Sequence, residues 1–139
     1  MKIVRNLAVV AAMGMAASIA ATPAMASAEG YLVTSCSSGG YGIELKVRYL
    51  TSATNHAFTE VSWRISGNVG GNNTVRVYFV QDAQPDVVFK AFNYTGGRTG
   101  TRKISVTRPK PHQVFVKLGA RFDTSASSDP GCTSQTRGI

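Results

Sequence analysis

Apolar residues occupy every second position along most of the chain from Tyr31 onward, and this alternation restricts the fold more than any other feature of the sequence. Over residues 41–50, Ile43, Leu45, Val47 and Tyr49 share one parity, and the positions between them are charged. Successive side chains of a β-strand point to opposite faces, so such a stretch forms a strand with one buried and one solvated face. No segment after residue 30 sustains the period of about 3.6 residues that a helix requires. We therefore predict an all-β domain.

Seven stretches of this kind are separated by clusters of Gly, Pro, Asn, Asp and Ser, which favour turns. The predicted strands are 31–36, 41–50, 58–66, 74–81, 87–94, 102–107 and 113–122. Seven short strands in a single domain indicate an antiparallel immunoglobulin-like β-sandwich, with the lone Trp63 as a core residue of the third strand. A small β-barrel is the alternative, because a strand count alone does not separate the two architectures.

The first 28 residues have the composition of a cleavable secretory signal peptide. Lys2 and Arg5 precede an uncharged, Ala-rich stretch at 7–21, and Pro23 follows it. Two cleavage sites with small residues fit the pattern, Ala24-Met25-Ala26 and Ala26-Ser27-Ala28, and the sequence does not choose between them. The apolar stretch is shorter than the roughly 20 residues of a membrane-spanning helix. We therefore expect a bacterial secreted protein whose mature domain is 29–139, without a membrane anchor.

The predicted mature domain contains two cysteines, Cys36 near its start and Cys132 near its end. In an oxidising compartment this pair is expected to form a disulfide, and a loop of that length stabilises the fold by roughly 4 to 5 kcal/mol in the chain-entropy model. A reactive or metal-binding thiol is the alternative, but neither cysteine has a second ligand pair or a base beside it. The Ser-, Gly- and Pro-rich segment 125–139 is expected to be a flexible tail, ordered chiefly at Cys132.

The charge of the predicted mature domain favours anionic partners. Of 15 basic residues, Lys2 and Arg5 leave with the signal peptide, so 13 remain against 7 acidic residues, a net charge of +6. No Asp or Glu occurs between residues 87 and 122. Basic and aromatic side chains share the positions expected to point outward, namely Lys46, Arg76, Lys90, Tyr78, Phe92 and Tyr94. Such a surface could hold a polyanion, whereas an ordinary solvated surface divided between two faces is the alternative until the strand pairing is known.

The predicted turn at 94–103 is a second candidate anion site. It holds three glycines, and Arg98, Arg102 and Lys103 flank them. Backbone N–H groups in a Gly-rich turn can point toward an anion, although the sequence lacks the Gly-Lys-Ser/Thr ending of a P-loop. An ordinary Gly-rich hairpin is the favoured interpretation, because glycine serves turn geometry first. Arg98 in an exposed loop would also suit a secreted inhibitor of trypsin-like proteases, but no disulfide is expected beside that loop to brace it.

Catalysis has little support in the sequence. His56 and His112 lie in separate predicted loops, without the spacing of a zinc site or the context of a hydrolytic triad. We therefore expect no enzymatic activity, no metal and no cofactor. The prediction is a monomeric binding protein whose partner is an anionic polymer or a protein at the cell surface, with the protease inhibitor as the alternative. Nucleic acid is not the partner we expect.

Three features together resemble small secreted all-β proteins of actinomycetes: the Ala-rich leader, the β-only mature part and the late Asp129-Pro130-Gly131-Cys132 turn. The resemblance covers the full length of the chain and rests on no specific motif. It implies an exported β domain, and it transfers neither a ligand nor any site residue.

Overall fold

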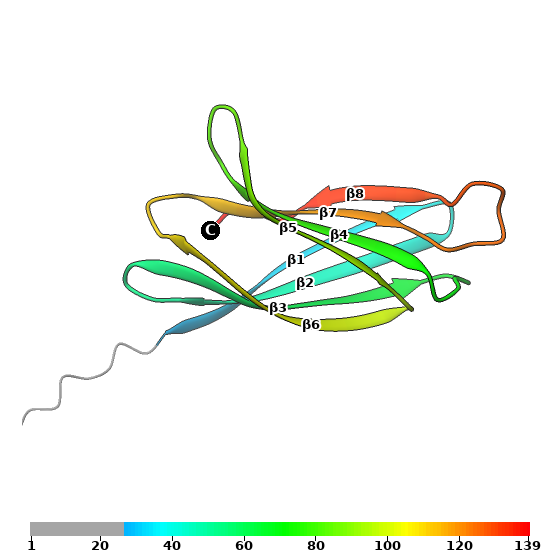
Figure 1. The fold of residues 1–139 in the computed structure, drawn as a ribbon, viewed down its shortest axis with the longest axis horizontal. Coiled ribbons are helices and arrows are strands. Elements are labelled where there is room, and N and C mark those ends of the chain that lie inside the picture. The colour runs from blue at the N-terminus through cyan, green and yellow to red at the C-terminus, as the bar shows by residue number, and fades with distance from the viewer. Residues whose placement is uncertain (1–26) are drawn as a thin grey trace, which may run out of the picture.

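The computed structural model describes residues 27–139, which form eight strands in two antiparallel four-stranded sheets (Figure 1). The signal peptide expected over 1–28 lies almost entirely outside these residues. The strands are β1 Ala28–Ser38, β2 Tyr41–Thr51, β3 Asn55–Ser66, β4 Asn73–Gln81, β5 Val87–Gly96, β6 Thr99–Pro109, β7 Val114–Arg121 and β8 Gly131–Gln135. Sheet A has the strand order β1-β2-β3-β6 and sheet B the order β5-β4-β7-β8. The described residues include no helix of the length and hydropathy needed to cross a membrane.

The core lies between the two sheets and is built from alternate residues of their facing sides. Sheet A contributes Leu45 and Phe58, and sheet B contributes Val77 and Phe79, all without exposed surface. Phe58 and Phe79 meet across the interface with ring centroids 4.9 Å apart. Burial of one face of each sheet against the other is the arrangement of a β-sandwich, and it explains the alternation in the sequence.

The two lateral sides of the sandwich differ. On one side, β1 and β8 are joined by the disulfide Cys36–Cys132, whose Cα atoms are 5.8 Å apart, and Thr34 Oγ1 donates a hydrogen bond of 2.9 Å to Ser134 Oγ. On the other side, β5 and β6 leave the short turn that joins them and enter different sheets (Figure 1). This second side is therefore an open edge of both sheets. We call it the β5–β6 edge.

The predicted sandwich and its disulfide are confirmed, with one more strand than expected. The two sheets of the described chain do not close on each other, so the barrel alternative is wrong. The first three strands are consecutive neighbours in sheet A, whereas an immunoglobulin domain places its third strand in the second sheet. The likeness to immunoglobulin domains is thus one of two-layer architecture and not of connectivity.

The eighth strand lies in the segment that we expected to be a flexible tail. β8 pairs with β7, and the pairing continues beyond it, since the backbone N–H groups of Thr136 and Ile139 donate hydrogen bonds of 2.9 Å to Val116 and Val114. Thr136 is buried. The polar composition of this segment suggested disorder, but the disulfide at Cys132 holds it beside β7, where its backbone completes the edge of sheet B.

The orientation predicted for β5 is wrong. Lys90, Phe92 and Tyr94 were expected to point outward, yet in register they lie opposite Phe79, Val77 and Val75 of β4, the residues that face the core. Directly opposed residues of antiparallel strands share a face of the sheet. These three side chains therefore project from the core-facing side of β5, at the β5–β6 edge.

Candidate anion-binding groove

Acidic residues within the strands are confined to sheet A. Glu29, Glu44 and Glu60 lie on β1, β2 and β3, and no described strand of sheet B contains an Asp or Glu. The other acidic residues of the described chain lie in loops, and they are Asp82, Asp86, Asp123 and Asp129. Charge is therefore distributed unequally between the two outer faces of the sandwich.

The outer face of sheet A is close to charge balance. Arg48 donates two hydrogen bonds of 2.9 Å to the carboxylate of Glu29, and this contact lowers the pKa of the Glu29 carboxyl group. In register, Glu44 lies opposite Arg64, and Glu60 lies opposite Arg48. Cations with acidic neighbours attract an external anion weakly, because the two charges largely cancel at a distance.

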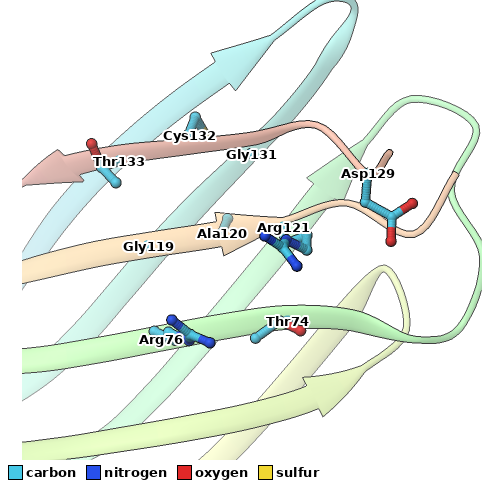
Figure 2. Close-up of a pocket in the computed structure, with 9 residues that line it drawn as sticks. All are labelled: Thr74, Arg76, Gly119, Ala120, Arg121, Asp129, Gly131, Cys132 and Thr133. Atoms are coloured by element: carbon cyan, nitrogen blue, oxygen red, sulfur yellow. The ribbon is translucent and has the colours of Figure 1, made fainter. Parts of the chain in front are cut away.

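Sheet B carries a groove on its outer face, at the point where β7 has a glycine instead of a side chain. Gly119 lies between Lys117 and Arg121 on β7 and directly opposite Arg76 on β4. Two adjoining hollows of about 410 and 480 Å³ share Arg76, Gly119 and Thr133 and form one groove. We call it the Gly119 groove, and Figure 2 shows its end at Arg121 and Asp129. It is bordered by Thr74, Arg76, Tyr78, Lys117, Arg121, Asp129, Thr133 and Gln135.

The β8 wall of the groove depends on the disulfide. Thr133 lies opposite Gly119 and Gln135 lies opposite Lys117, so both side chains share the outer face. Cys132 has the other parity and lies opposite the buried Ala120, on the core-facing side. The bridge from Cys132 to Cys36 of β1 therefore holds β8 from behind and leaves its outer surface free for the groove.

A buried amide holds β4 against the end of β7. Asn73 has no exposed surface, and its Nδ2 donates hydrogen bonds to the carbonyl oxygens of Gly70, at 2.8 Å, and Gly96, at 3.1 Å. Its Oδ1 accepts a hydrogen bond of 2.8 Å from the N–H of Asp123. A buried amide with its hydrogen bonds made fixes the segments that it joins. Asn73 thus sets the relative position of the β4 and β7 residues at this end of the groove.

The cations of the groove have no anionic partner among residues 27–139. No described carboxylate lies within salt-bridge distance of Arg76, Lys117 or Arg121. Asp129 borders the groove at its end, and its carboxylate accepts a hydrogen bond of 3.1 Å from the backbone of Thr124. The groove is therefore lined by both polar and apolar surface, and it carries three cations that form no salt bridge within the described chain.

The residues predicted as binding residues do not form one patch. Arg76 and Tyr78 border the Gly119 groove. Lys46 and Lys103 lie on the outer face of sheet A, opposite Ser62 and Glu60. The residues at the β5–β6 edge are Lys90, Phe92, Tyr94 and Arg102, and Arg98 lies in the β5–β6 turn. The three cations Lys46, Arg76 and Lys90, which were predicted to share one surface, thus lie on three different surfaces. The single basic and aromatic surface that the sequence suggested is absent from the described chain.

Aromatic rings at the β5–β6 edge form a stack that fills the side of the sandwich. Tyr94 stacks on Trp63 with centroids 5.6 Å apart and on Phe92 with centroids 5.8 Å apart. The guanidinium of Arg102 lies 5.3 Å from the Trp63 ring centroid, and Lys90 Nζ lies 5.4 Å from that of Phe92. Burial in this stack raises the pKa of the Tyr94 hydroxyl. Charged residues that point inward from edge strands discourage pairing with another chain, so the cluster has a structural explanation.

The side chain of Arg98 is engaged within the fold. Its guanidinium donates a hydrogen bond to the carbonyl oxygen of Gly67, in the loop between β3 and β4. Its own carbonyl oxygen accepts a hydrogen bond of 2.6 Å from the N–H of Ile65. Arg98 therefore ties the β5–β6 turn to the end of β3.

The groove includes three residues that the sequence did not single out as site residues, namely Lys117, Gly119 and Arg121. The pattern Lys117-Leu118-Gly119-Ala120-Arg121 places two cations and a missing side chain on one face of a strand. Glycine within a strand often marks a place where a ligand or another backbone approaches closely. That signal was present, but its significance depends on the pairing with Arg76.

The described residues bring together no cluster of three His, Cys, Asp or Glu side chains that could hold a metal ion. His56 is buried and contacts Thr51 Oγ1 through Nδ1 at 2.9 Å, whereas His112 is exposed in the β6–β7 loop. Both cysteines belong to the disulfide. No protein-family model, no curated protein and no solved structure matches the chain.

Proposed function

We propose that this protein is secreted and binds an anionic polymer along the Gly119 groove, without catalysing a reaction. The observation that carries the proposal is the distribution of charge over the sandwich. Arg76, Lys117 and Arg121 surround an open groove on a sheet whose strands contain no acidic residue. Three cations without a salt bridge around one groove attract a chain of negative charges more strongly than a charge-balanced face does.

The lining of the groove favours a polymer over a folded protein as the ligand. The centres of protein interfaces are rich in aromatic and apolar side chains and poor in charge. The groove instead borders a single aromatic ring, that of Tyr78, and its charged side chains are three cations along its length and Asp129 at one end. The large apolar side chains that are exposed in the described chain lie elsewhere, on β1 and β5. A flexible polyanion is the partner that fits this surface.

The proposal of secretion is supported by the disulfide, since structural disulfides persist in oxidising compartments. The alternative of a protease inhibitor lacks comparable support. An inhibitor of trypsin-like proteases inserts a free basic side chain into the specificity pocket, but the Arg98 guanidinium is bound to the Gly67 carbonyl oxygen. The inhibitor therefore has less support than polyanion binding.

Binding to heparin, used as a generic polyanion, tests the proposal through two matched triple variants. Arg76→Ala/Lys117→Ala/Arg121→Ala removes three cations from the groove. Lys46→Ala/Arg64→Ala/Lys103→Ala removes three cations from the outer face of sheet A and serves as the control with the same net charge. Urea unfolding of both variants shows that any loss of binding is not a loss of folding.

We expect the affinity of the wild type to fall with salt, with a slope of log K against log salt of about −2, because each of three cations releases about 0.7 of a counterion from a single-stranded polyanion. The groove variant should lose this binding, and the sheet A variant should keep most of it. Equal weakening in both triples would mean that only net charge acts. Flow-through of the wild type at low salt would refute polyanion binding altogether.

A further inference from the structure

We propose that the Gly119 groove is matched to a phosphodiester polymer of the poly(polyol phosphate) class, in which six covalent bonds separate successive phosphorus atoms. This inference rests on the proposed function and specifies its ligand. It is carried by the arrangement of the three cations on the paired strands β4 and β7. Each cation would bind one of three successive phosphates.

The register of β4 and β7 sets the spacing of these cations. Lys117 and Arg121 lie four residues apart on β7, which corresponds to about 13 Å along the strand. Arg76 lies opposite Gly119, midway between them, on the neighbouring strand. Diagonal neighbours on one face of an antiparallel pair are about 7 to 8 Å apart. The path from Lys117 to Arg76 to Arg121 is therefore a zigzag of two nearly equal steps.

A phosphodiester chain through three-carbon polyol units repeats at the same step. Its repeat contains six bonds from one phosphorus atom to the next, as does a pair of residues in the protein backbone. An extended backbone advances about 7 Å over two residues. The phosphates of such a polymer, lying extended in the groove, can thus meet the three cations in turn. Inorganic polyphosphate has two bonds between successive phosphorus atoms, so its phosphates lie closer together than the three cations. Some of its phosphates would therefore have no cation opposite them.

The kinds of side chain in the groove also fit a phosphodiester. Two of the three cations are arginines, whose planar guanidinium binds phosphate oxygens in a bidentate manner. Figure 2 shows Arg76 and Arg121 on adjacent strands, with Thr74 on β4 beside them. Thr74 and Thr133 supply hydroxyl groups that can donate to and accept from polyol hydroxyls. The missing side chain at Gly119 leaves room for the polymer between the cations.

A single-stranded nucleic acid has the same six-bond repeat but needs a different surface. Its bases stack on several aromatic side chains in the proteins that bind it without sequence preference. The groove borders one ring only, that of the half-buried Tyr78. The stacked rings of Phe92, Tyr94 and Trp63 are at the β5–β6 edge, on the core-facing side. The composition of the groove thus favours the polyol chain.

Calorimetric titration of the purified protein with synthetic oligo(glycerol phosphate) tests the inference. We expect the affinity to rise about two- to fivefold with each of the second and third phosphates, as for exposed charge pairs, and then to level off. Linear polyphosphate of equal charge should bind at least tenfold more weakly. Gly119→Leu should reduce oligo(glycerol phosphate) affinity at least tenfold. Its matched control, Ser62→Leu on the outer face of sheet A, should leave this affinity unchanged, with the folding of both variants checked by urea unfolding.

The outcomes separate this inference from the proposed function. Heparin binding that depends on Arg76, Lys117 and Arg121, together with equal affinities for oligo(glycerol phosphate) and polyphosphate, would overturn the phosphodiester match and leave polyanion binding in place. An oligothymidylate of equal charge that binds more tightly than oligo(glycerol phosphate) would make nucleic acid the ligand and overturn the inference. Absence of binding to all of these probes would refute both proposals.

Discussion

Replacement of Gly100 by alanine is expected to destabilise the fold, because the new methyl group has no room. Gly100 lies on β6 directly opposite Trp63. A Cβ atom at this position would collide with three atoms of the Trp63 indole, one of them Cε2 at 2.5 Å. The indole cannot yield freely, since it is 4 % exposed, stacks on Tyr94 and lies beneath the guanidinium of Arg102.

The expected loss in free energy of unfolding follows from two opposing effects. Overpacking of a filled site costs about 1 to 3 kcal/mol. Alanine in a strand is more favourable than glycine by about 0.5 to 1 kcal/mol, because its unfolded chain has less entropy to lose. With the middle value of each range, the net loss for Gly100→Ala is about 1.3 kcal/mol. With a denaturant slope of about 1.5 kcal/mol per molar urea, the unfolding midpoint falls by roughly 1 M.

Fluorescence of Trp63, the single tryptophan of the chain, monitors the unfolding, and circular dichroism provides a second signal independent of the ring. Gly119→Ala is the matched control, because its Cβ would meet only Arg76 Cβ at an ordinary 3.8 Å. That variant should gain up to about 1 kcal/mol. A Gly100→Ala midpoint equal to or above that of the wild type would refute the packing argument. The same holds if both glycine variants shift in one direction.

Two further predictions concern the disulfide and a buried histidine. Cys36→Ser/Cys132→Ser opens a loop with a sequence separation of 96 and should lower the free energy of unfolding by about 4 to 5 kcal/mol, as measured by urea unfolding; a change below about 1 kcal/mol would contradict the chain-entropy argument. Burial first, and the nearby charge of Lys110 second, lower the pKa of His56, so the unfolded state binds a proton more readily than the folded state does. Stability should be constant above the unfolded pKa of about 6.5 and fall as the pH decreases toward the folded pKa, and a His56→Gln variant should lose this dependence between pH 7.5 and 5.5. Parallel curves for both proteins would exclude His56 as the group responsible.

The core was predictable from parity in strands that have one buried face. Nine of the ten residues expected to point inward on β2, β3 and β4 are buried, and the tenth, Tyr49, is half-buried beside the bulge in β2. The nine are Ile43, Leu45, Val47, Val61, Trp63, Ile65, Val75, Val77 and Phe79. Each of these strands has a neighbour on both sides, so one face is covered along its whole length. Under that condition, an apolar residue and a charged residue cannot exchange positions without burying a charge.

The alternation of apolar and charged residues gave the wrong orientation for β5, because an edge strand has a neighbour on one side only and its core-facing side is not fully covered. Val87, Val88 and Phe89 are contiguous, and a bulge shifts the register between Phe79 and Val80 of β4. Lys90 shares its parity with Phe92, and a lysine was expected to point toward solvent. At an edge, however, a lysine stem can lie along the core-facing side while its ammonium group reaches water past the last strand. The position of Lys90 over the Phe92 ring, at 5.4 Å, has this geometry.

The groove lay beyond sequence analysis because its residues meet only through strand pairing. Arg76 and Gly119 are far apart in the chain, and β5 and β6 lie between them in sequence. The acid-free stretch 87–122 appeared to be one basic segment, but it contributes β5 and β7 to sheet B and β6 to sheet A. The meaningful asymmetry is that between the two sheets. It requires both the strand order and the placement of Glu29, Glu44 and Glu60.

Gly119 itself is the strongest link between the fold and the proposed function. A glycine in the interior of a central strand costs about 0.5 to 1 kcal/mol relative to alanine, and β7 has neighbours on both sides. Gly100 and Gly131 have a packing reason, since a Cβ atom at either would collide with the Trp63 ring or the Ala120 carbonyl oxygen. At Gly119 neither a positive φ nor a close contact demands glycine. Gly119 thus has an unfavourable residue type for a strand without a structural reason, and such positions are expected where a ligand needs the space of the missing side chain.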